Sequence, residues 1–213
     1  PVLSRGLGDV YKRQDLVITS LTVPGHEACV ANLEAAGIPY LVTEPKTLLD
    51  IPTDIEKIAS ALNASKQGHQ LATHFRQTII DEQKRTAAQQ QEAVPILVEW
   101  WPKPVIVPAQ DSWINQMMEV VGAYNPWHHQ AGKSLIISDE QALSSHSAAI
   151  VMSWCGVKEE KYHSHVVTRR DGWQNLPAIK NHQVYPISEA YLGRPGPRLL
   201  QGLSLIHISE PTR

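Results

Sequence analysis

The feature that most constrains the fold is a long stretch without any strand pattern, set between two regions of alternating strands and helices. From Thr53 to about Gln91 the residues are mostly Ala, Gln, Lys, Glu, Leu and Ile, which are good helix formers. The residues TDIE at 53–56 fit a capping box at a helix start, and residues 63–68 predict a break before a second helix. A helix of about 25 residues is roughly 37 Å long, which suits a strut between two lobes.

The region before this stretch predicts a β-α-β unit. Residues 15–21 form a short apolar run typical of a buried strand, and residues 38–43 form another. Between them, residues 26–36 have helical spacing, and Gly37 stands where a helix commonly ends. Such crossovers make parallel sheets.

The region after Pro95 resumes the alternation of strands and helices. Strands are predicted at 96–100, 105–107, 149–154 and 183–187, and helices at 112–122, at 159–166 and from Pro197 onward. We therefore expect an α/β protein with two Rossmann-like lobes joined by a long backbone helix, the first lobe being incomplete. The predicted parts are a remnant of the N-terminal lobe at 15–51, the linking backbone helix at 52–92 and the C-terminal lobe at 93–202.

The two ends of the chain are interpreted as artefacts of sequencing adaptors. Residues 9–14, DVYKRQ, can be back-translated as GAT GTG TAT AAG AGA CAG, and residues 203–208, LSLIHI, as the reverse complement of that word. Residues 1–14 and 203–213 are therefore set aside as adaptor-derived, and the natural part, 15–202, is expected to be a metagenomic fragment without its own signal sequence.

Composition excludes several classes of function. Without the ends, 15 Lys and Arg (19 − 4) stand against 19 Asp and Glu (21 − 2), a net charge of −4 that provides no basic patch for nucleic acid. No apolar run approaches the roughly 20 residues that span a membrane. The two cysteines, Cys29 and Cys155, are far apart and form no metal-ligand pattern. Two buried free thiols are expected, and a disulfide between them is the alternative.

Bulky aromatic residues follow the predicted strands, where parallel sheets bind their ligands. Trp100 and Trp101 follow one strand, Trp154 another and Tyr191 a third, while Trp113 begins a helix at the same rim. Aromatic side chains on such loops indicate a binding surface for a large, flat, partly apolar ligand. Trp127 and Trp173 are interpreted as structural. The further candidate ligand-binding residues are Ser20, Leu21, Lys103, Cys155, Gly156 and Arg194.

Several motifs resemble a known family of proteins. The segments LEAAGI (33–38), VEWWPKPVIVPAQDSW (98–113), VMSWCGV (151–157) and the run from Trp173 to Leu199 are similar to the helical-backbone class of substrate-binding proteins of ABC importers, in its cobalamin-binding branch. The resemblance implies a monomeric periplasmic or extracellular protein, free or lipid-anchored, that carries cobalamin or another corrinoid to a permease dimer without catalysis and without a cofactor. It implies that Trp100, Trp101, Trp154 and Tyr191 line the cleft.

The resemblance also implies which residues contact the permease and how well the fragment binds its ligand. Glu27 matches an acidic residue that meets the permease, and Glu189 is the candidate counterpart in the second lobe. Glu27 is equally explained as a first-turn acid that favours the helix dipole. About the first third of the family pattern is missing, so residues 15–202 alone are expected to bind ligand weakly or not at all.

Two alternative functions stay open at the level of sequence. Arg194 and Tyr191 leave room for a ferric siderophore or haem as the ligand. A metal-dependent enzyme would use His128 and His129, or His163 and His165, but residues one or two apart on a helix do not face each other, and neither pair has a third ligand at a recognisable spacing. We therefore expect neither a metal site nor a catalytic residue, and Cys155 has no histidine or acid near it in the sequence to activate it.

Overall fold

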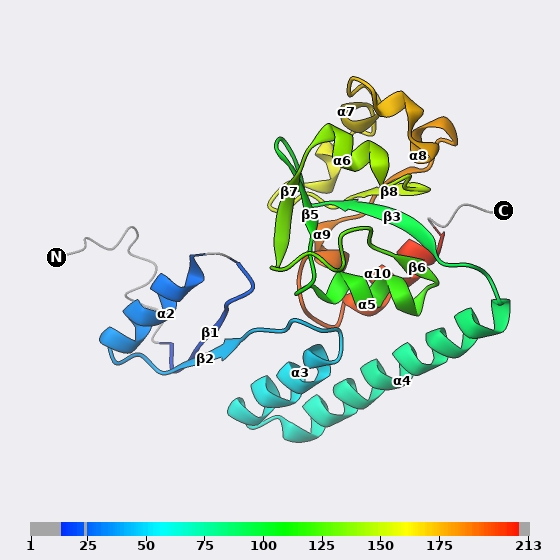
Figure 1. Cartoon of the computed structure of the whole chain (residues 1–213). Coiled ribbons are helices and arrows are strands. Elements are labelled where there is room, and N and C mark those ends of the chain that lie inside the picture. The colour runs from blue at the N-terminus through cyan, green and yellow to red at the C-terminus, as the bar shows by residue number, and fades with distance from the viewer. Residues whose placement is uncertain (1–13, 24, 209–213) are drawn as a thin grey trace. The chain divides into compact units, whose positions relative to one another are not determined.

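The chain divides into two compact units, Pro1–Glu44 (unit 1) and Pro45–Arg213 (unit 2), and each is described by itself (Figure 1). The structure is a computed structural model and describes residues 14–23 and 25–208. The boundary between the two units falls between residues 44 and 45, whereas the sequence predicts that the first lobe ends at residue 51. The difference arises because residues 45–51 pack with unit 2, where Leu48 and Ile51 are each only 1% exposed in the core.

Unit 1 contains the β-α-β crossover that the sequence predicts. Strands β1 (Val17–Ser20) and β2 (Tyr40–Thr43) pair in parallel, with Val17 opposite Tyr40, and helix α2 (His26–Ala35) connects them. Gly37 follows the helix with a φ of +65°, a left-handed conformation that glycine adopts without steric cost. Helix α2 has no buried residue, so the described part of unit 1 buries little apolar surface.

Unit 2 begins with two helices packed side by side. Helix α3 (Asp50–Ala61) is followed after a short break by α4 (Ser65–Gln89), which has the 25 residues expected of the long helix. The two helices approach closely at Gly68, where an added Cβ would lie 2.2 Å from the Cβ of Ala59. The missing side chain of Gly68 therefore lets α4 lie against α3 (Figure 1).

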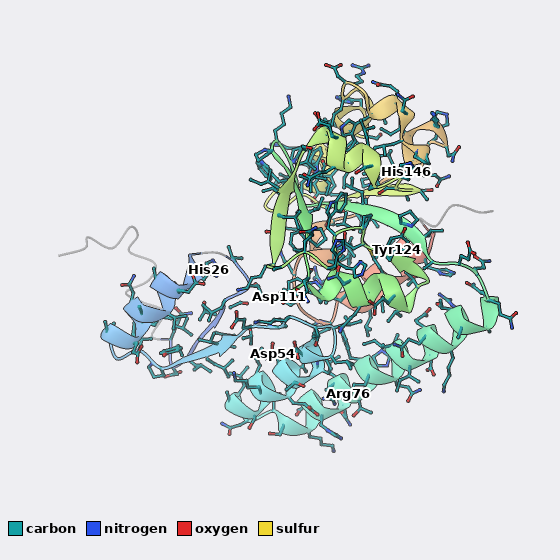
Figure 2. All side chains as sticks on the ribbon, in the orientation of Figure 1. His26, Asp54, Arg76, Asp111, Tyr124 and His146 are labelled. Atoms are coloured by element: carbon teal, nitrogen blue, oxygen red, sulfur yellow. The ribbon has the colours of Figure 1, made fainter. Side chains whose placement is uncertain are left out.

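The predicted capping box at 53–56 is wrong. Helix α3 begins three residues earlier, at Asp50, and the Thr53 hydroxyl donates to the carbonyl of Leu49. Proline fits the first turn of a helix, where its missing N–H is not needed, so Pro52 is accommodated there. The Glu56 carboxylate instead accepts two hydrogen bonds, at 2.8 and 3.3 Å, from Arg76. Arg76 lies on α4 (Figure 2). A tertiary ion pair thus replaces the local cap.

We expect this ion pair to make the stability of unit 2 depend on acid pH. Hydrogen bonds from Arg76, and then from His69, lower the pKa of Glu56 from 4.5 to about 2. A carboxyl whose pKa is lower in the folded chain stabilises the fold above its unfolded pKa, and that contribution is lost as the pH falls through the folded value. We expect the Tm of unit 2, measured by circular dichroism, to fall between pH 5 and pH 2 and Glu56→Gln to remove part of that fall. Arg76→Gln should remove the same part, and superimposable pH profiles of the variants and the unaltered protein would contradict the assignment.

A parallel sheet forms the centre of unit 2. Its order is β6-β3-β8-β9, and β3 pairs with both β6 and β8 in parallel. The strands predicted at 96–100, 149–154 and 183–187 are confirmed with shifted ends, and β6 was not predicted. The bounds are β3 (Val94–Glu99), β6 (Ala123–Tyr124), β8 (Ala149–Met152) and β9 (Val184–Pro186).

A second, antiparallel sheet has the order β4-β5-β7. Its strands are β4 (Trp101–Pro102), β5 (Val105–Pro108) and β7 (Ser134–Ile137). Only β5 was predicted. β4 has two residues, and the short apolar run of β7, SLII, was overlooked. Ser138 then caps helix α6 (Asp139–Ser144) in a true capping box with Gln141.

The parallel sheet separates two hydrophobic cores. Alternate residues point to opposite faces of a strand, so Ile96 and Val98 lie in the first core, while Leu97 lies in the second. The first core also takes residues of α4, of α5 (Trp113–Val120) and of α10 (Leu199–Ile208). The second core packs against the antiparallel sheet and includes Trp127 and Trp173, which confirms both as structural.

The remaining helices of unit 2 are short and were partly mispredicted. Instead of one helix over 159–166, the chain forms a 3₁₀ turn η1 (Glu159–Lys161) and then helix α7 (His165–Thr168). Tyr162, between them, has an extended backbone with φ −81° and ψ 95°, and its ring is buried in the second core. The others are η2 (Trp173–Asn175), α8 (Pro177–Lys180) and α9 (Glu189–Leu192). Helix α10 continues from Leu199 through residues 203–208, and Leu203 and Ile206 are buried. The cysteines are free but exposed rather than buried.

Candidate ligand-binding site

The segments that follow β3 and β8 are bonded together at the carboxyl edge of the parallel sheet. The amide of Ser153 donates to the carbonyl of Glu99, and the amide of Cys155 donates to that of Trp100. The sequence therefore correctly predicts that these two loops meet. We call the segments 100–104, 153–157 and 187–194 the rim.

Two of the five aromatic residues predicted to form the binding surface are buried in the cores instead. Trp113 is 5% exposed in the first core, where its indole N–H donates to the carbonyl of Leu192 at 2.8 Å. Trp154 is also 5% exposed, but in the second core, on the other face of the sheet. Successive residues of an extended segment point to opposite faces, so Trp154, which follows β8, is directed to the second core. Trp113 is the first residue of helix α5 and packs with that helix in the first core.

Trp100, Trp101 and Tyr191 are the rim aromatics that keep accessible surface. Trp101 is 38% exposed, and its indole N–H donates to the carbonyl of Lys103 at 3.0 Å, which fixes the ring on the hairpin turn. Trp100 and Tyr191 are half-buried against the first core. A ligand could therefore contact Trp101 across its face and the other two rings only in part.

Glu189 organises the polar part of the rim. Its carboxylate accepts hydrogen bonds from the amide of Gly156 and from Arg194, whose Nε lies 2.7 Å away. The sequence predicts Gly156 and Arg194 for the ligand and Glu189 for the permease, and the structure brings all three together. The Glu189 side chain is only 12% exposed, so its contact with a partner would be limited unless Arg194 moves.

The thiol of Cys155 lacks the features of a nucleophile. Desolvation and the nearby carboxylate of Glu189 raise its pKa above the ordinary value of 9.0. Burial likewise raises the pKa of Tyr162 to about 12, so its hydroxyl stays protonated and donates to the carbonyl of Trp154 at 2.7 Å. A reactive cysteine needs the opposite shift, toward the thiolate.

Ser20, Leu21 and Glu27 lie in unit 1, around the end of β1 and the start of α2. The ring of His26, at the start of α2 (Figure 2), lies 2.7 Å from the carbonyl of Ser20, which accepts a hydrogen bond from it. The Ser20 hydroxyl lies 3.0 Å from that of Thr22. The Glu27 carboxylate accepts the amide of Gly25 at 2.9 Å. That bond supports the helix-start interpretation of Glu27, and its contact with a permease stays a prediction.

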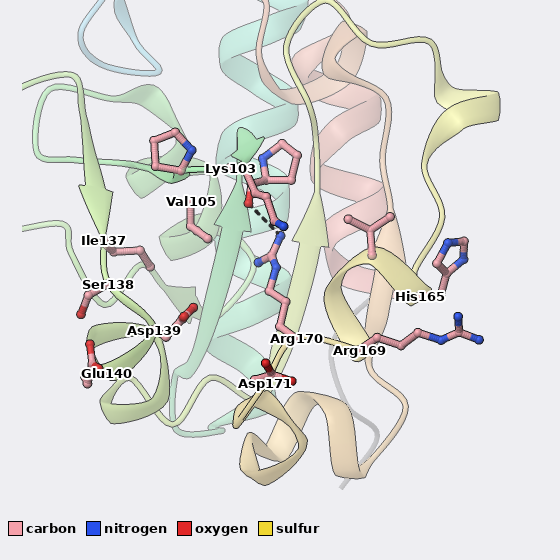
Figure 3. Close-up of a pocket in the computed structure, with 13 residues that line it drawn as sticks. Lys103, Val105, Ile137, Ser138, Asp139, Glu140, His165, Arg169, Arg170 and Asp171 are labelled. Atoms are coloured by element: carbon pink, nitrogen blue, oxygen red, sulfur yellow. Dashed lines mark hydrogen bonds between the residues drawn. The ribbon is translucent and has the colours of Figure 1, made fainter.

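A pocket of about 750 Å³ lies beside the hairpin that carries Trp101 (Figure 3). Such a volume is typical of small-molecule sites. Ser138, Asp139 and Glu140 line one side, and His165 and Arg169 line the other. Lys103 also lines it, the one predicted ligand residue that does. The other lining residues are Pro102, Pro104, Val105, Ile137, Val166, Arg170 and Asp171.

The paired histidines differ from expectation in one respect. The rings of His163 and His165 are stacked, with centroids 5.4 Å apart and planes at 10°, because His163 precedes helix α7 and is not on it. His128 and His129 are in an edge contact at 5.4 Å. Within residues 14–23 and 25–208, no group of three or more His, Cys, Asp or Glu side chains is placed to hold a metal ion.

A family model described as periplasmic binding protein matches residues 15–191. The chain belongs to this family. The matched part of this periplasmic binding protein includes β1 to β9 and almost the whole rim. Every helix in residues 14–23 and 25–208 is too short or too polar to cross a bilayer.

Curated relatives match most of the length of this periplasmic binding protein. It is 29% identical over 177 residues to the uncharacterized ABC transporter substrate-binding lipoprotein YvrC of Bacillus subtilis, and the match covers 82% of this chain and 54% of YvrC. It is 24% identical over 174 residues to the vitamin B12-binding protein of Vibrio parahaemolyticus, covering 80% of this chain and 59% of that protein. The chain thus spans between half and three fifths of these relatives.

Solved structures show that the fold is shared. The vitamin B12-binding protein BtuF of Vibrio cholerae superimposes with a TM-score of 0.72 at 24% identity, covering 92% of this chain and 73% of BtuF. An ABC transporter substrate-binding protein from Listeria monocytogenes superimposes with a TM-score of 0.79 at 17% identity, covering 92% of this chain and 76% of that protein. The heme-binding protein RhuT of Roseiflexus superimposes with a TM-score of 0.78 at 20% identity, covering 92% of this chain and 75% of RhuT. The predicted α/β class with parallel sheets and long helices is confirmed.

Sequence reasoning missed Glu99 and Arg170. Glu99 is fully buried at the end of β3, and Arg170 lines the pocket. A signal was present for Glu99, since it ends the apolar strand VPILVE and a charge at such a position requires a partner. Nothing in the sequence points to Arg170, which lies 71 positions away in the chain.

Proposed function

We propose that the chain is part of the extracytoplasmic substrate-binding component of an ABC importer, which captures cobalamin and delivers it to a permease dimer without chemical change. The observation that carries the proposal is the conjunction of family membership with several relatives named vitamin B12-binding protein. The accessible Trp101 ring and the half-buried Trp100 and Tyr191 suit a flat, partly apolar macrocycle. The proposal also takes Trp100, Trp101 and Tyr191 as the aromatic residues that contact the ligand. It assigns docking roles to Glu27 and Glu189, and it includes a monomeric state and a periplasmic or extracellular location, free or lipid-anchored.

Haem is the second candidate. It is supported by the fold shared with RhuT and with a heme-binding protein from Pseudomonas aeruginosa. The rim favours cobalamin over an anionic ligand in one respect, because the guanidinium of Arg194 is already paired with Glu189. A free arginine would be the expected partner of a carboxylate-bearing haem or of an acidic ferric siderophore.

The proposal is tested by calorimetric titration of the complete gene product with cyanocobalamin, haemin and a ferric hydroxamate. We expect cyanocobalamin to bind most tightly and Trp101→Ala to weaken it by about tenfold or more, since roughly 100 Å² of lost apolar contact is worth about 2.5 kcal/mol. Trp127→Phe, in the second core, is the control and should leave the affinity unchanged. Tighter binding of haemin would transfer the proposal to haem, and binding of none of the three would contradict it.

A further inference from the structure

A buried carboxylate stands at the carboxyl end of β3, directly before the two rim tryptophans. Glu99 is 0% exposed and lies on the face of the sheet that carries the second core. Among the residues that the structure describes, it is the one charged side chain in the buried class. Removing a carboxylate from water is costly unless charged and hydrogen-bonding partners compensate, so the partners of Glu99 define its role.

The partners of Glu99 come from two other segments of unit 2. Arg170 donates to both carboxylate oxygens, with Nη2 2.9 Å from Oε1. The indole N–H of Trp154 donates to the same Oε1 at 2.8 Å. Trp154 stands immediately before Cys155 and Gly156, so Glu99 anchors the start of the rim segment that contains them.

Arg170 extends this contact to the pocket. Its Nη2 donates to the carbonyl of Pro102 at 3.3 Å, within the hairpin that carries Trp101 and Lys103 (Figure 3). Its guanidinium also lies 4.4 Å from the centre of the Trp173 ring. The indole N–H of Trp173 in turn donates to Asp139, on the pocket wall, at 2.8 Å.

We propose that Glu99 and Arg170 are positioning residues of the ligand site, whose ion pair holds the hairpin at 101–104, the rim segment after Trp154 and the pocket wall at Asp139 in one fixed arrangement. The inference rests on the proposed function and deepens it. A preorganised site binds more tightly because less order must be created when the ligand arrives. All the fixed segments border the rim or the pocket, which is the arrangement expected of a network that serves binding.

Stability alone is a weak explanation for this pair. A buried ion pair often contributes little net stability compared with apolar residues of the same volume. Its hydrogen bonds, however, are directional, and a fully satisfied polar network specifies one geometry among several that packing would allow. The arginine fork is planar and contacts Glu99, Pro102 and Trp173 at once, which lysine could not reproduce.

The experiment compares Arg170→Lys and Glu99→Gln with a matched control, Glu56→Gln, which breaks the Glu–Arg pair between α3 and α4. The first readout is the indole N–H resonances of the 15N-labelled complete gene product without ligand. We expect the Trp154 and Trp173 signals to shift in both site variants, the Trp127 signal to stay in place, and none of the three to shift in Glu56→Gln.

The second readout is the affinity for cyanocobalamin by calorimetry. Both site variants should bind cyanocobalamin about tenfold more weakly. This is the lower end of the loss in affinity seen when a residue that supports a metal ligand through a hydrogen bond is replaced. Their far-ultraviolet circular dichroism should be unchanged. Glu99→Gln keeps an acceptor for Trp154 and should be the milder change. Shifted indole signals with unaltered affinity would overturn the positioning role and leave a structural one. Absence of binding by the unaltered protein would instead overturn the proposed function, and unshifted Trp154 signals would overturn the contact itself.

Discussion

Replacing Trp173 by alanine is expected to lower the free energy of unfolding of unit 2 by roughly 3–5 kcal/mol, the usual cost of truncating a large aromatic residue in a core. The ring is fully buried in the second core and lies under the guanidinium of Arg170. Its loss would create a cavity and would also remove the hydrogen bond to Asp139. The effect should therefore reach the upper part of that range.

Urea titration monitored by tryptophan fluorescence measures this loss. All six tryptophans lie between Trp100 and Trp173, so the signal reports on unit 2 and is insensitive to unit 1. Trp101→Ala is the matched control, because that ring is 38% exposed and a surface substitution should change stability by less than about 1 kcal/mol. Equal midpoints for the two variants would show that the second core does not depend on Trp173.

Gly68→Ala is expected to destabilise unit 2 by about 1–3 kcal/mol, the typical cost of overfilling a packed interface. In an ordinary helix interior the same change would stabilise by up to about 1 kcal/mol, because alanine is the better helix former. Here the new methyl group would lie 2.2 Å from the Cβ of Ala59, so α3 and α4 would have to separate. The packing cost therefore exceeds the gain in helix propensity.

A compensating change makes this prediction specific. Ala59→Gly removes the methyl group that the new side chain would meet, so the double variant Ala59→Gly with Gly68→Ala should recover most of the lost stability. The two sites touch, and a coupling energy above about 0.5 kcal/mol in the double-mutant cycle is the expected sign of contact. Strictly additive effects would mean that the helices do not approach at these residues.

Local patterns predicted the elements of this fold where a long run of residues carried one signal. The long helix and a break before it follow from composition and from Asn63. The break predicted at 63–68 is wrong for residues 65–68, which form the first turn of α4. The apolar runs before Trp100 and Trp154 gave the two central strands. Predictions that depended on a few residues failed: the capping box was lost because Glu56 bonds to Arg76, and the helix over 159–166 is interrupted at Tyr162, whose backbone is extended and whose ring is buried in the second core.

The position of the candidate site in the fold was predictable, but the direction in which each of its side chains points was not. Placing aromatic residues at the ends of parallel strands correctly located the rim, since the strand ends of a parallel sheet share one edge. Which rings stay accessible depends on the face to which each residue points. Trp101 remained exposed, whereas Trp113 and Trp154 were taken into different cores.

By itself, the sequence determined the α/β alternation, the long helix and the sheet edge at which the aromatic segments meet, because these depend on periodicity and on residue type within short segments. Only the tertiary structure decided which aromatic rings are buried, which side chains line the pocket and that Glu99 meets Arg170. Those outcomes depend on contacts between residues that are distant in the chain, and a buried charge finds its partner in space rather than at a fixed spacing in the sequence.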